Sequence, residues 1–376
     1  MQYPLFSILM MKIMKSVFFF PCAVTLVMMT ALPSWSAASD VQTAPSHTMA
    51  VASPEYMLSR HTLHMGTLVS VKVFAKTPED VKRLAAYLDD EVAVYEDMLS
   101  VHKSTPLNEV NRRAGEAVEV PEEVAQMSQQ ALEIASETDG MFEPMIGPVV
   151  NLWKIGFGGA HVPSEADIAH AVEKVDRSQV RIWQENDRWF MRIGVGQSID
   201  MGAIAKGYIG TRLAEKLQQQ GMTRGILDLG GNVVTIGSRA EGEPWKIGIQ
   251  HPSQERGGYF AVVRAADESV VTSGAYERYF EENGRRYSHI LDPKTGRPAK
   301  TDIASVTIIH RDGARADALC TALFAMGWDR ASDFLRSRPD LKAIVMHADM
   351  TTIVMTPPAA SVVTPADSSV KLTVLK

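Results

Sequence analysis

Cysteine is scarce in this sequence: its 376 residues include two, Cys22 and Cys320. Cys22 lies in an apolar N-terminal run that we expect to be removed, and the small residue that would mark a lipid-modified cysteine does not precede it. The mature chain would then keep Cys320 alone, which excludes an internal disulfide. Without a lipid on Cys22, we expect the mature protein to be soluble.

An excess of positive charge is lacking as well, because 38 Lys and Arg stand against 44 Asp and Glu. The net charge is −6 at pH 7 and the pI is near 6.0, and no cluster of Lys and Arg with interleaved aromatic residues occurs. These features exclude nucleic acid as an expected partner. The sequence also lacks a repeat at solenoid periods, a Walker A loop and a GxGxxG motif. Its apolar content of 45% is nevertheless ample for a core.

The N-terminus has the pattern of a secretory signal peptide. Two lysines precede the apolar run from Val17 to Leu32, and small residues follow from Pro33 to Ala38. We therefore expect residues 1–38 to be cleaved on export, which places the mature protein in the periplasm. The alternative is an uncleaved membrane anchor, but the run is short for a span of about 20 residues and contains Pro21.

The rest of the chain divides into three parts. Residues 39–55 are rich in Ala, Ser, Thr and Pro, which is typical of a flexible spacer. Residues 56–356 form the globular region, and residues 357–376 form a C-terminal tail. The tail is expected to be mobile, although Val370 to Leu375 could add a terminal strand.

The first half of the globular region predicts a strand, two helices and a shaped loop. The strand covers Arg60 to Phe74 with an interruption at Met65-Gly66-Thr67, where glycine marks either an irregularity or a close approach to a ligand. The helices cover Pro78 to Tyr95 and Pro121 to Thr138. The following stretch, residues 141–159, mixes Pro and Gly with aromatics, so it is either a loop that lines a flat ring system or a linker.

The segment from Ile199 to Tyr208 carries Asp200 at a strand end, a turn of small residues, and Lys206 at the start of a helix that runs to Leu217. Exposed N–H groups and the helix dipole favour anions there, and lysine adds a full charge. The segment is thus either a phosphate site or a tight junction that needs small residues for packing.

The stretch from Tyr287 to Gly327 carries the strongest chemical signals. His289 and Asp292 precede a turn that proline and glycine favour. Asp317 and Thr321 lie four residues apart on one face of an otherwise apolar helix. Either Asp317 caps that helix and Thr321 bonds back to the carbonyl of Asp317, or the two oxygens bind a hard cation such as Mg²⁺.

Seven segments in order resemble the FAD:protein FMN transferase (ApbE) family, from about residue 56 to residue 355. They are Met65-Gly66-Thr67, the loop from Asp139 to Trp153, IDMGAIAKGY from Ile199, DLGGN from Asp228, TSGAYER from Thr272, HILDPKTGRP from His289 and ADALCTALFAMG from Ala316. The resemblance implies an α+β fold with mixed sheets, flanking helices and two lobes around a flavin cleft.

The resemblance also implies the reaction, which is magnesium-dependent transfer of FMN from FAD to a Ser or Thr hydroxyl of an acceptor protein, with release of AMP. The metal would be held by the carbonyl of Ala203, the carboxylate of Asp317 and the hydroxyl of Thr321. His289 would activate the acceptor hydroxyl, because imidazole titrates near neutral pH, and Asp292 would orient the imidazole or serve the turn. The implied flavin-nucleotide contacts are Met65, His102, Met141, Phe142, Glu143, Asp200, Lys206 and Leu291.

Three positions depart from the family pattern. His102 stands where the family often has Tyr, Glu143 stands where Asp is usual, and Ala275 replaces a frequent Asp. None of the three touches the implied metal ligands or His289, so we expect an active enzyme whose acceptor belongs to a membrane or periplasmic electron-transfer system. The alternatives are a Mg²⁺-dependent FAD pyrophosphatase that yields FMN and AMP, and a flavin-binding carrier without catalysis.

Overall fold

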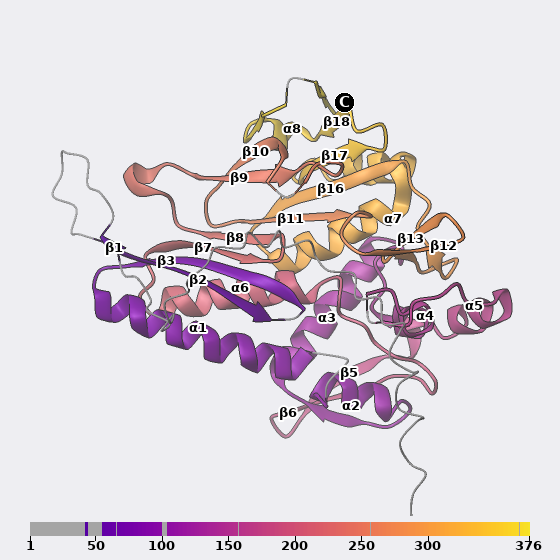
Figure 1. The fold of residues 1–376 in the computed structure, drawn as a ribbon. Helices are drawn as coiled ribbons and strands as arrows, with labels where there is room; N and C mark the ends of the chain where they lie inside the picture. The colour runs from indigo at the N-terminus through magenta and orange to yellow at the C-terminus, as the bar shows by residue number, and fades with distance from the viewer. Residues whose placement is uncertain are drawn as a thin grey trace, which may run out of the picture. The chain divides into compact units, whose positions relative to one another are not determined.

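The computed structural model describes residues 42–43, 55–64, 66–99, 104–156, 158–255, 257–367 and 369–376 (Figure 1). All of them belong to the unit formed by residues 39–376. The expected signal peptide, nearly all of the expected spacer, and the implied flavin contacts Met65 and His102 lie outside the described residues.

A mixed ten-stranded sheet lies at the centre of the fold. Neighbouring strands are antiparallel except β18 and β20, which run parallel. β16 is buried at seven of its eight positions, as expected for a β-branched, apolar strand covered on both faces. In sheet order the strands are β1 (Gln42–Thr43), β2 (Tyr56–His64), β3 (Thr67–Ala75), β7 (Arg224–Leu229), β8 (Asn232–Ile236), β11 (Ser269–Gly274), β16 (Ile303–His310), β17 (Lys342–His347), β18 (Thr352–Met355) and β20 (Lys371–Val374).

Three helices cover one face of this sheet. α1 (Pro78–Leu99) packs on β2 and β3, α6 (Ala205–Gln219) on β7 and β8, and α7 (Gly313–Ser337) on β11 and β16. Their apolar stripes and the inward side chains of the strands form the largest core. α3 (Glu122–Glu137) packs against α7 from the side.

A smaller sheet covers part of the opposite face. Its strands are β19 (Val363–Pro365), β10 (Tyr259–Ala265) and β9 (Trp245–Gln250). Trp245 and Phe260 of this sheet form a second core together with those side chains of the central sheet that point away from the helices.

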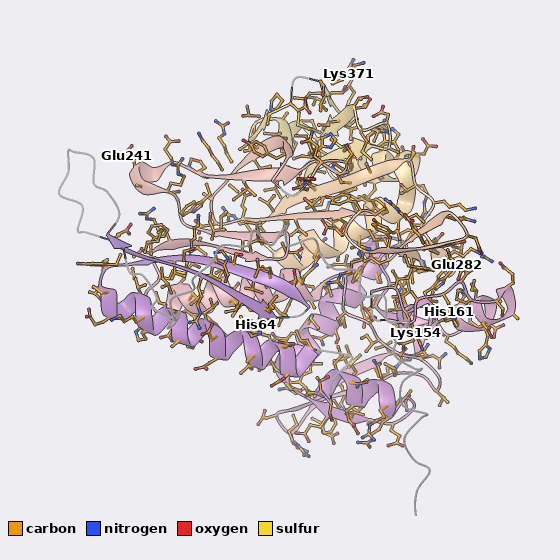
Figure 2. The ribbon with its side chains drawn as sticks, viewed as in Figure 1. His64, Lys154, His161, Glu241, Glu282 and Lys371 are labelled. Atoms are coloured by element: carbon orange, nitrogen blue, oxygen red, sulfur yellow. The ribbon has the colours of Figure 1, made fainter. Side chains whose placement is uncertain are left out.

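A third core surrounds Trp153, whose indole Nε1 donates to the carbonyl of Gly296 at 2.7 Å. Lys154, labelled in Figure 2, follows α4 (Gly147–Trp153) as its C-cap residue and has the left-handed backbone conformation.

The remaining elements are short. They are α2 (Pro106–Arg112), β4 (Val118–Val120), η1 (Pro144–Ile146), α5 (Glu165–Val172), η2 (Arg177–Gln179), β5 (Arg181–Glu185), β6 (Arg188–Arg192), η3 (Ala240–Gly242), β12 (Tyr279–Glu282), β13 (Arg285–Ser288), β14 (Leu291–Asp292), β15 (Arg297–Pro298) and α8 (Pro357–Ala360).

The α+β class with mixed sheets and flanking helices is confirmed, but three expectations for elements were wrong. Residues 60–74 are not one interrupted strand but the hairpin β2–β3, which turns at Gly66 with a φ of +67° that glycine adopts readily. The stretch 141–159 contains η1 and α4, because each proline there sits in a first helical turn. The tail is ordered into α8, β19 and β20, which confirms the alternative of a terminal strand.

None of the helices among the described residues is long and apolar enough to cross a membrane.

Candidate active site

Several strand ends meet at one edge of the central sheet. By register, Val69 lies opposite Leu229, Asn232 opposite Val271, and Gly274 opposite Ser305. The β2–β3 turn, the β7–β8 turn and the end of β11 therefore gather at this edge. Asp228, which begins the DLGGN segment, and Thr272, which begins the TSGAYER segment, lie at these strand ends, as does Ser273.

Asp317 lies beneath this edge, at the junction of α6 and α7. Its side chain is buried, and Oδ2 accepts a hydrogen bond from the backbone N of Gly207 at 3.0 Å. Gly207 is in the first turn of α6, whose N-cap residue, Ile204, makes no side-chain capping bond. The carboxylate therefore binds at a helix N-terminus, where orphan N–H groups and the helix dipole favour negative charge.

The same junction explains why position 207 is glycine. A Cβ added there would lie 2.0 Å from the carbonyl oxygen of Gly313 and 2.9 Å from Cβ of Asp317. The two helix starts touch through backbone, and a side chain at position 207 would push them apart. The glycine after Lys206 thus serves packing, as one of the two alternatives held, and its backbone N–H also binds Asp317.

Thr321 lies one turn beyond Asp317. Its Oγ1 donates to the carbonyl of Asp317 at 3.2 Å and lies 3.4 Å from Oγ of Ser273. The sequence analysis gave, as one alternative, a capping role for Asp317 with Thr321 bonded back to its carbonyl, and this hydrogen bond is present. The capping part is wrong: Asp312 is the N-cap of α7, and it accepts from the N of Arg315 at 3.2 Å.

The donor set of this junction fits a hard cation. The resemblance assigns a backbone carbonyl (Ala203), a carboxylate (Asp317) and a hydroxyl (Thr321), all oxygen donors of the kind that Mg²⁺ prefers. Ala203 lies in the turn whose next two N–H groups, those of Ile204 and Ala205, donate to the carbonyl of Met201. Among the described residues, no three His, Cys, Asp or Glu side chains form a metal-binding group, so this junction offers a single carboxylate rather than a cage.

His289 is held by the carbonyl of Arg278. The backbone N of His289 donates to that oxygen at 3.0 Å, and the imidazole Nδ1 also lies 3.0 Å from it. A carbonyl can only accept, so Nδ1 carries the proton and Nε2 keeps its lone pair in the neutral ring. Partial burial of the ring, as the largest cause, and the positive charges of Arg278 and Lys206 together lower the pKa of His289 to about 4, although the hydrogen bond to the Arg278 carbonyl acts in the opposite direction. The ring is therefore neutral near pH 7, and the expectation that this imidazole titrates near neutral pH was wrong.

Asp292 serves the turn. Its Oδ1 accepts from the N of Lys294 at 2.8 Å, and its carbonyl accepts from the N of Gly296 at 2.8 Å. The carbonyl of Arg278, not Asp292, contacts the Nδ1 of His289. Of the two roles considered for Asp292, the structure shows the one in the turn.

The loop from Met141 to Glu143 is buried and fixed. Glu143 pairs with Arg177 at 2.7 Å, and its other oxygen accepts from the N of Met145 at 3.1 Å. The backbone N of Asp200 donates to the carbonyl of Pro144 at 2.7 Å, which ties the loop to the turn before α6. Leu291 instead packs in the core around Trp153. The ion pair gives a physical reason for Glu at position 143, because the longer side chain reaches Arg177.

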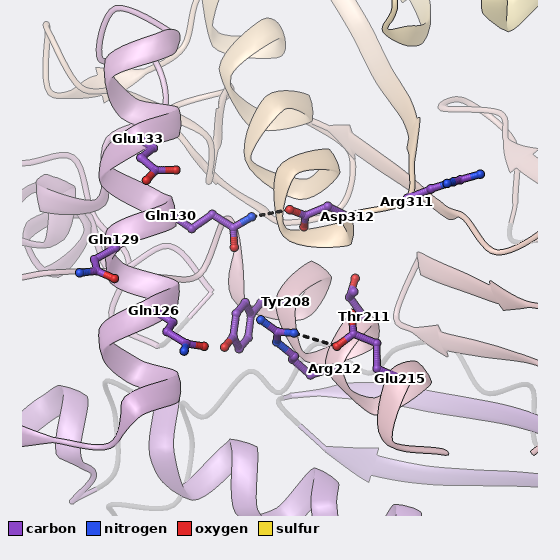
Figure 3. A pocket seen from close by; sticks show the side chains of 10 residues that line it. All are labelled: Gln126, Gln129, Gln130, Glu133, Tyr208, Thr211, Arg212, Glu215, Arg311 and Asp312. Atoms are coloured by element: carbon purple, nitrogen blue, oxygen red, sulfur yellow. Dashed lines mark hydrogen bonds and ion pairs between the residues drawn. The ribbon is translucent and has the colours of Figure 1, made fainter. Parts of the chain in front are cut away.

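A polar cavity of about 520 Å³ opens between α3 and α6, beside the start of α7 (Figure 3). None of the residues that line it is a predicted site residue, so this cavity is not the flavin site that the resemblance implies. Its lining comprises Gln126, Gln129, Gln130, Glu133, Tyr208, Thr211, Arg212, Glu215, Arg311 and Asp312.

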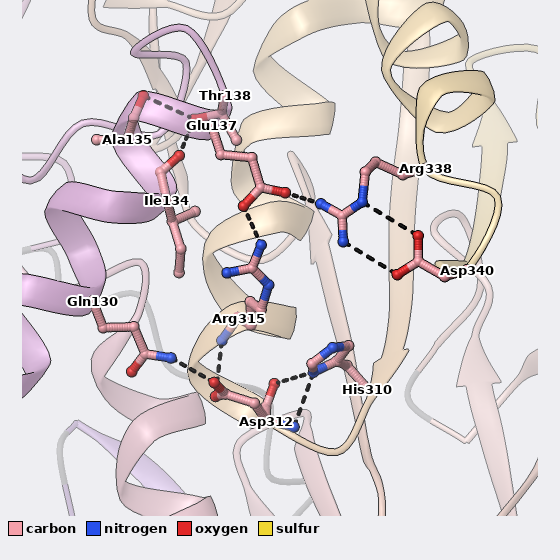
Figure 4. A network of polar contacts seen from close by, with 10 residues as sticks. All are labelled: Gln130, Ile134, Ala135, Glu137, Thr138, His310, Asp312, Arg315, Arg338 and Asp340. Carbon is pink, nitrogen blue, oxygen red and sulfur yellow. Dashed lines mark hydrogen bonds and ion pairs between the residues drawn. The ribbon is translucent and has the colours of Figure 1, made fainter.

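A network of polar contacts fixes α7 against α3 (Figure 4). Glu137 of α3 pairs with both Arg315 and Arg338, and Gln130 donates to Asp312 at 2.5 Å. Because Arg315 and Asp312 belong to the first turn and the N-cap of α7, the network holds the helix start that carries Asp317.

Sequence reasoning missed two partners of the site. The hydrogen bond from Gly207 to Asp317 joins residues far apart in the chain. The one sequence signal that could have indicated this contact is the glycine that follows Lys206. The carbonyl of Arg278 had no sequence signal, because every residue has a carbonyl.

The model of the ApbE family matches residues 65–345 of the chain. The chain belongs to the ApbE family. A FAD:protein FMN transferase of Klebsiella pneumoniae (strain 342) is 36% identical over 295 residues, which cover 78% of this chain and 90% of that relative. Another, of Treponema pallidum (strain Nichols), is 34% identical over 313 residues, which cover 77% and 84%.

Solved ApbE structures share the fold. The ApbE protein of Thermotoga maritima is 29% identical and matches with a TM-score of 0.73 over 81% of this chain and 99% of its own. The flavin transferase ApbE of Vibrio cholerae is 26% identical, with a TM-score of 0.67 over 78% and 94%. The ApbE match ends at residue 345, so β18, α8, β19 and β20 follow it.

Proposed function

We propose that this chain is an FAD:protein FMN transferase, which moves FMN from FAD onto a Ser or Thr hydroxyl of an acceptor protein and releases AMP. Membership of the ApbE family and the names of the relatives support this proposal. The observation that carries it is the state of His289, a neutral imidazole with its Nε2 lone pair unprotonated.

His289 acts as the general base. Nε2 takes the proton of the acceptor hydroxyl while the hydroxyl oxygen forms a bond to the FMN phosphorus of FAD. The bond from that phosphorus to the bridging oxygen breaks, and AMP leaves with that oxygen. The carbonyl of Arg278 fixes the ring and its tautomer, which keeps Nε2 directed at the acceptor throughout.

Asp317, Thr321 and the carbonyl of Ala203 would hold Mg²⁺. When bound, the ion neutralises the pyrophosphate and stabilises the charge on the departing AMP. Lys206 adds positive charge at the start of α6, where the backbone N–H groups favour phosphate oxygens. Buried beside that helix start, Asp317 places its carboxylate without competition from bulk water.

The remaining residues position the flavin nucleotide. Met141, Phe142, Glu143 and Asp200 belong to the loop and the turn that one backbone hydrogen bond joins. Leu291 would contribute through its backbone, because its side chain is buried around Trp153. Met65 and His102 complete the proposed set.

We also propose export to the periplasm and an acceptor in a membrane or periplasmic electron-transfer system. The lysines, apolar run and small residues of the N-terminus support this part. Cell fractionation with N-terminal sequencing tests it: the mature N-terminus should begin after Ser36 or Ala38 in the periplasmic fraction. A full-length chain in the membrane fraction would contradict it.

The reaction is tested by chromatography of AMP released from FAD and Mg²⁺, with and without a purified electron-transfer acceptor made in cells that lack a flavin transferase. A fluorescent gel reports protein-bound flavin in the same samples. We expect AMP and a fluorescent acceptor band together, and expect a chelator to abolish both. AMP without a band would favour FAD hydrolysis, and FAD binding without AMP would favour a carrier.

A further inference from the structure

Ser273, near the end of β11, carries a hydroxyl that the roles assigned so far leave unused. Val271 of the same strand lies in the core beneath the helices, and alternation along a strand puts Ser273 on that face as well. The side chain is 9% exposed, so its hydroxyl needs a hydrogen-bond partner. Among the described residues, that partner is Thr321 of α7, whose Oγ1 lies 3.4 Å from the Oγ of Ser273.

The direction of this contact follows from the protons that are present. The hydroxyl of Thr321 has one proton, and it donates that proton to the carbonyl of Asp317 at 3.2 Å. A carbonyl can only accept, so the proton that lies between the two hydroxyls belongs to Ser273. Ser273 therefore donates and Thr321 accepts.

These two hydrogen bonds set the direction of the Thr321 hydroxyl. A hydroxyl oxygen has two lone pairs, and the proton of Ser273 occupies one of them. The other lone pair is the one left for a cation, which the oxygen donors of this junction fit. Without Ser273, the bond to the Asp317 carbonyl alone would hold the hydroxyl, and its lone pairs would no longer be directed.

A second pair of hydroxyls, one residue away, points to the opposite face of the sheet. Thr272 follows Val270, which belongs to the core on the far side of the central sheet, at the alternating position. Its Oγ1 lies 2.9 Å from that of Thr307 on the neighbouring strand β16. Thr272 and Ser273 thus make the same kind of bond from adjacent positions, and of the two it is Ser273 that reaches α7.

We propose that Ser273 is a positioning residue for the metal site, and that it holds the hydroxyl of Thr321 so that one lone pair stays available to Mg²⁺. This inference rests on the proposed function, because it takes Thr321 as a ligand of the ion. Partners of a metal ligand raise affinity by orienting the ligand before the ion arrives. In this role Ser273 touches neither the ion nor the substrate.

The test measures the affinity for the ion directly. Quenching of flavin fluorescence reports FAD binding while Mg²⁺ is titrated, and electron paramagnetic resonance reports Mn²⁺ binding to the same complex of protein and FAD. Ser273→Ala should raise the Kd of both ions about tenfold, a usual effect of losing such a partner. The Kd for FAD in the presence of a chelator should not change, and excess Mg²⁺ should restore most of the AMP release.

Two further variants separate positioning from packing. Ser273→Thr keeps the hydroxyl and should recover most of the affinity for both ions. Thr272→Val removes the matched hydroxyl on the other face, so it should leave both Kd values at wild type. Thermal unfolding of all three variants shows what each lost hydrogen bond contributes to Tm, and that contribution should not follow the change in ion affinity.

The other outcomes overturn the inference. An unchanged Kd for Mg²⁺ in Ser273→Ala, whatever its Tm, would leave Ser273 a role in packing alone. A weaker Kd for FAD in the presence of chelator would show that Ser273 contacts the nucleotide itself. The proposed function fails in a different way: a wild-type chain whose FAD binding and AMP release do not respond to Mg²⁺ would remove the metal site, and the role of Ser273 with it.

Discussion

At the residue scale, the state of His289 follows from one backbone carbonyl. Two donors of the same residue share the oxygen of Arg278, which leaves Nε2 as the acceptor. Burial then keeps the ring neutral, and that is the form a general base needs. Neither fact depends on a carboxylate partner, so the turn role of Asp292 does not weaken the assignment.

His289→Ala should lower kcat about 10²- to 10⁴-fold, which is the usual contribution of a positioned general base. FAD affinity should be retained, because His289 is assigned no contact with the nucleotide. Stopped assays of AMP release and equilibrium binding of FAD measure the two effects. His161→Ala, at an exposed histidine, is the control; a normal kcat in His289→Ala would remove this residue from the mechanism.

The depressed pKa of His289, to about 4, also makes a prediction for stability. In the unfolded chain the ring titrates near pH 6.5, so between about pH 6.5 and 4 the unfolded state binds a proton that the folded state does not. Stability contributed by this group is therefore present above pH 6.5 and is lost as the pH falls toward 4.

Urea midpoints at pH 7 and pH 4.5 check this prediction. The wild type should lose more stability between the two pH values than His289→Gln, whose side chain does not titrate. Equal losses in the two proteins would mean that the folded pKa of His289 is ordinary.

Asp317 has a structural role and a proposed chemical role, and two substitutions separate them. Asp317→Asn keeps an oxygen for the N–H of Gly207 and should leave Tm near wild type while it abolishes Mg²⁺-dependent turnover. Asp317→Ala leaves that buried N–H unpaired and should cost about 1–3 kcal/mol in addition. Thermal unfolding and Mg²⁺ titrations of the activity measure both; wild-type turnover in Asp317→Asn would reject the metal assignment.

At the element scale, the site depends on how closely α6 and α7 approach. Their first turns touch at Gly207 and Gly313, and the hydrogen bond to Asp317 spans the same contact. The network of Glu137 with Arg315 and Arg338 holds α7 from the other side. The active site is thus an interface of two helix starts under a sheet edge.

Gly207→Ala should destabilise the protein by about 1–3 kcal/mol, because the added Cβ meets backbone that cannot move aside. Gly210→Ala in the same helix is the matched control. Its Cβ would meet a methyl group of Val234, and both substitutions gain the same helix propensity. Denaturant unfolding should place Gly207→Ala below Gly210→Ala; the reverse order would contradict the close helix contact.

The comparison of sequence and structure is also clearest for elements. The pair Asp317 and Thr321 was predicted to share a helix face, and it does, because a spacing of four is local. Asp317 as the N-cap of α7 was one of two alternatives and was wrong, because the N-cap is Asp312, which lies before the apolar stretch that begins at Ala316. The hairpin at Gly66 was read as an interruption, because turn chemistry there rests on one glycine. The contact of Gly207 with Asp317 depends on tertiary packing, which no local pattern encodes.

At the scale of the whole molecule, the C-terminal segment joins two sheets. β19 pairs with β10, and β20 extends the central sheet beside β18. Lys371, labelled in Figure 2, begins β20, and its N donates to the carbonyl of Thr351 at 2.7 Å. The sequence analysis expected a mobile tail, but backbone pairing and the burial of Val370 give it a defined structure.

Ending the chain at Asp367 should remove β20 and lower the free energy of unfolding by about 2–4 kcal/mol, through the lost burial of Val370 and Leu372. It would also expose β18 as a new edge, which favours aggregation. Thermal unfolding and light scattering measure the two effects. Lys371→Ala, which keeps the strand, is the control; a truncated chain as stable as this control would show that β20 contributes nothing.

The central claim is that FMN becomes covalently attached to a hydroxyl of another protein. Intact mass spectrometry of a purified electron-transfer acceptor, after incubation with this protein, FAD and Mg²⁺, tests it most directly. The account predicts one added FMN phosphoryl group per acceptor, mapped to a Ser or Thr, with much slower addition by His289→Ala and no addition with chelator. An acceptor of unchanged mass in a sample that has released AMP would contradict it.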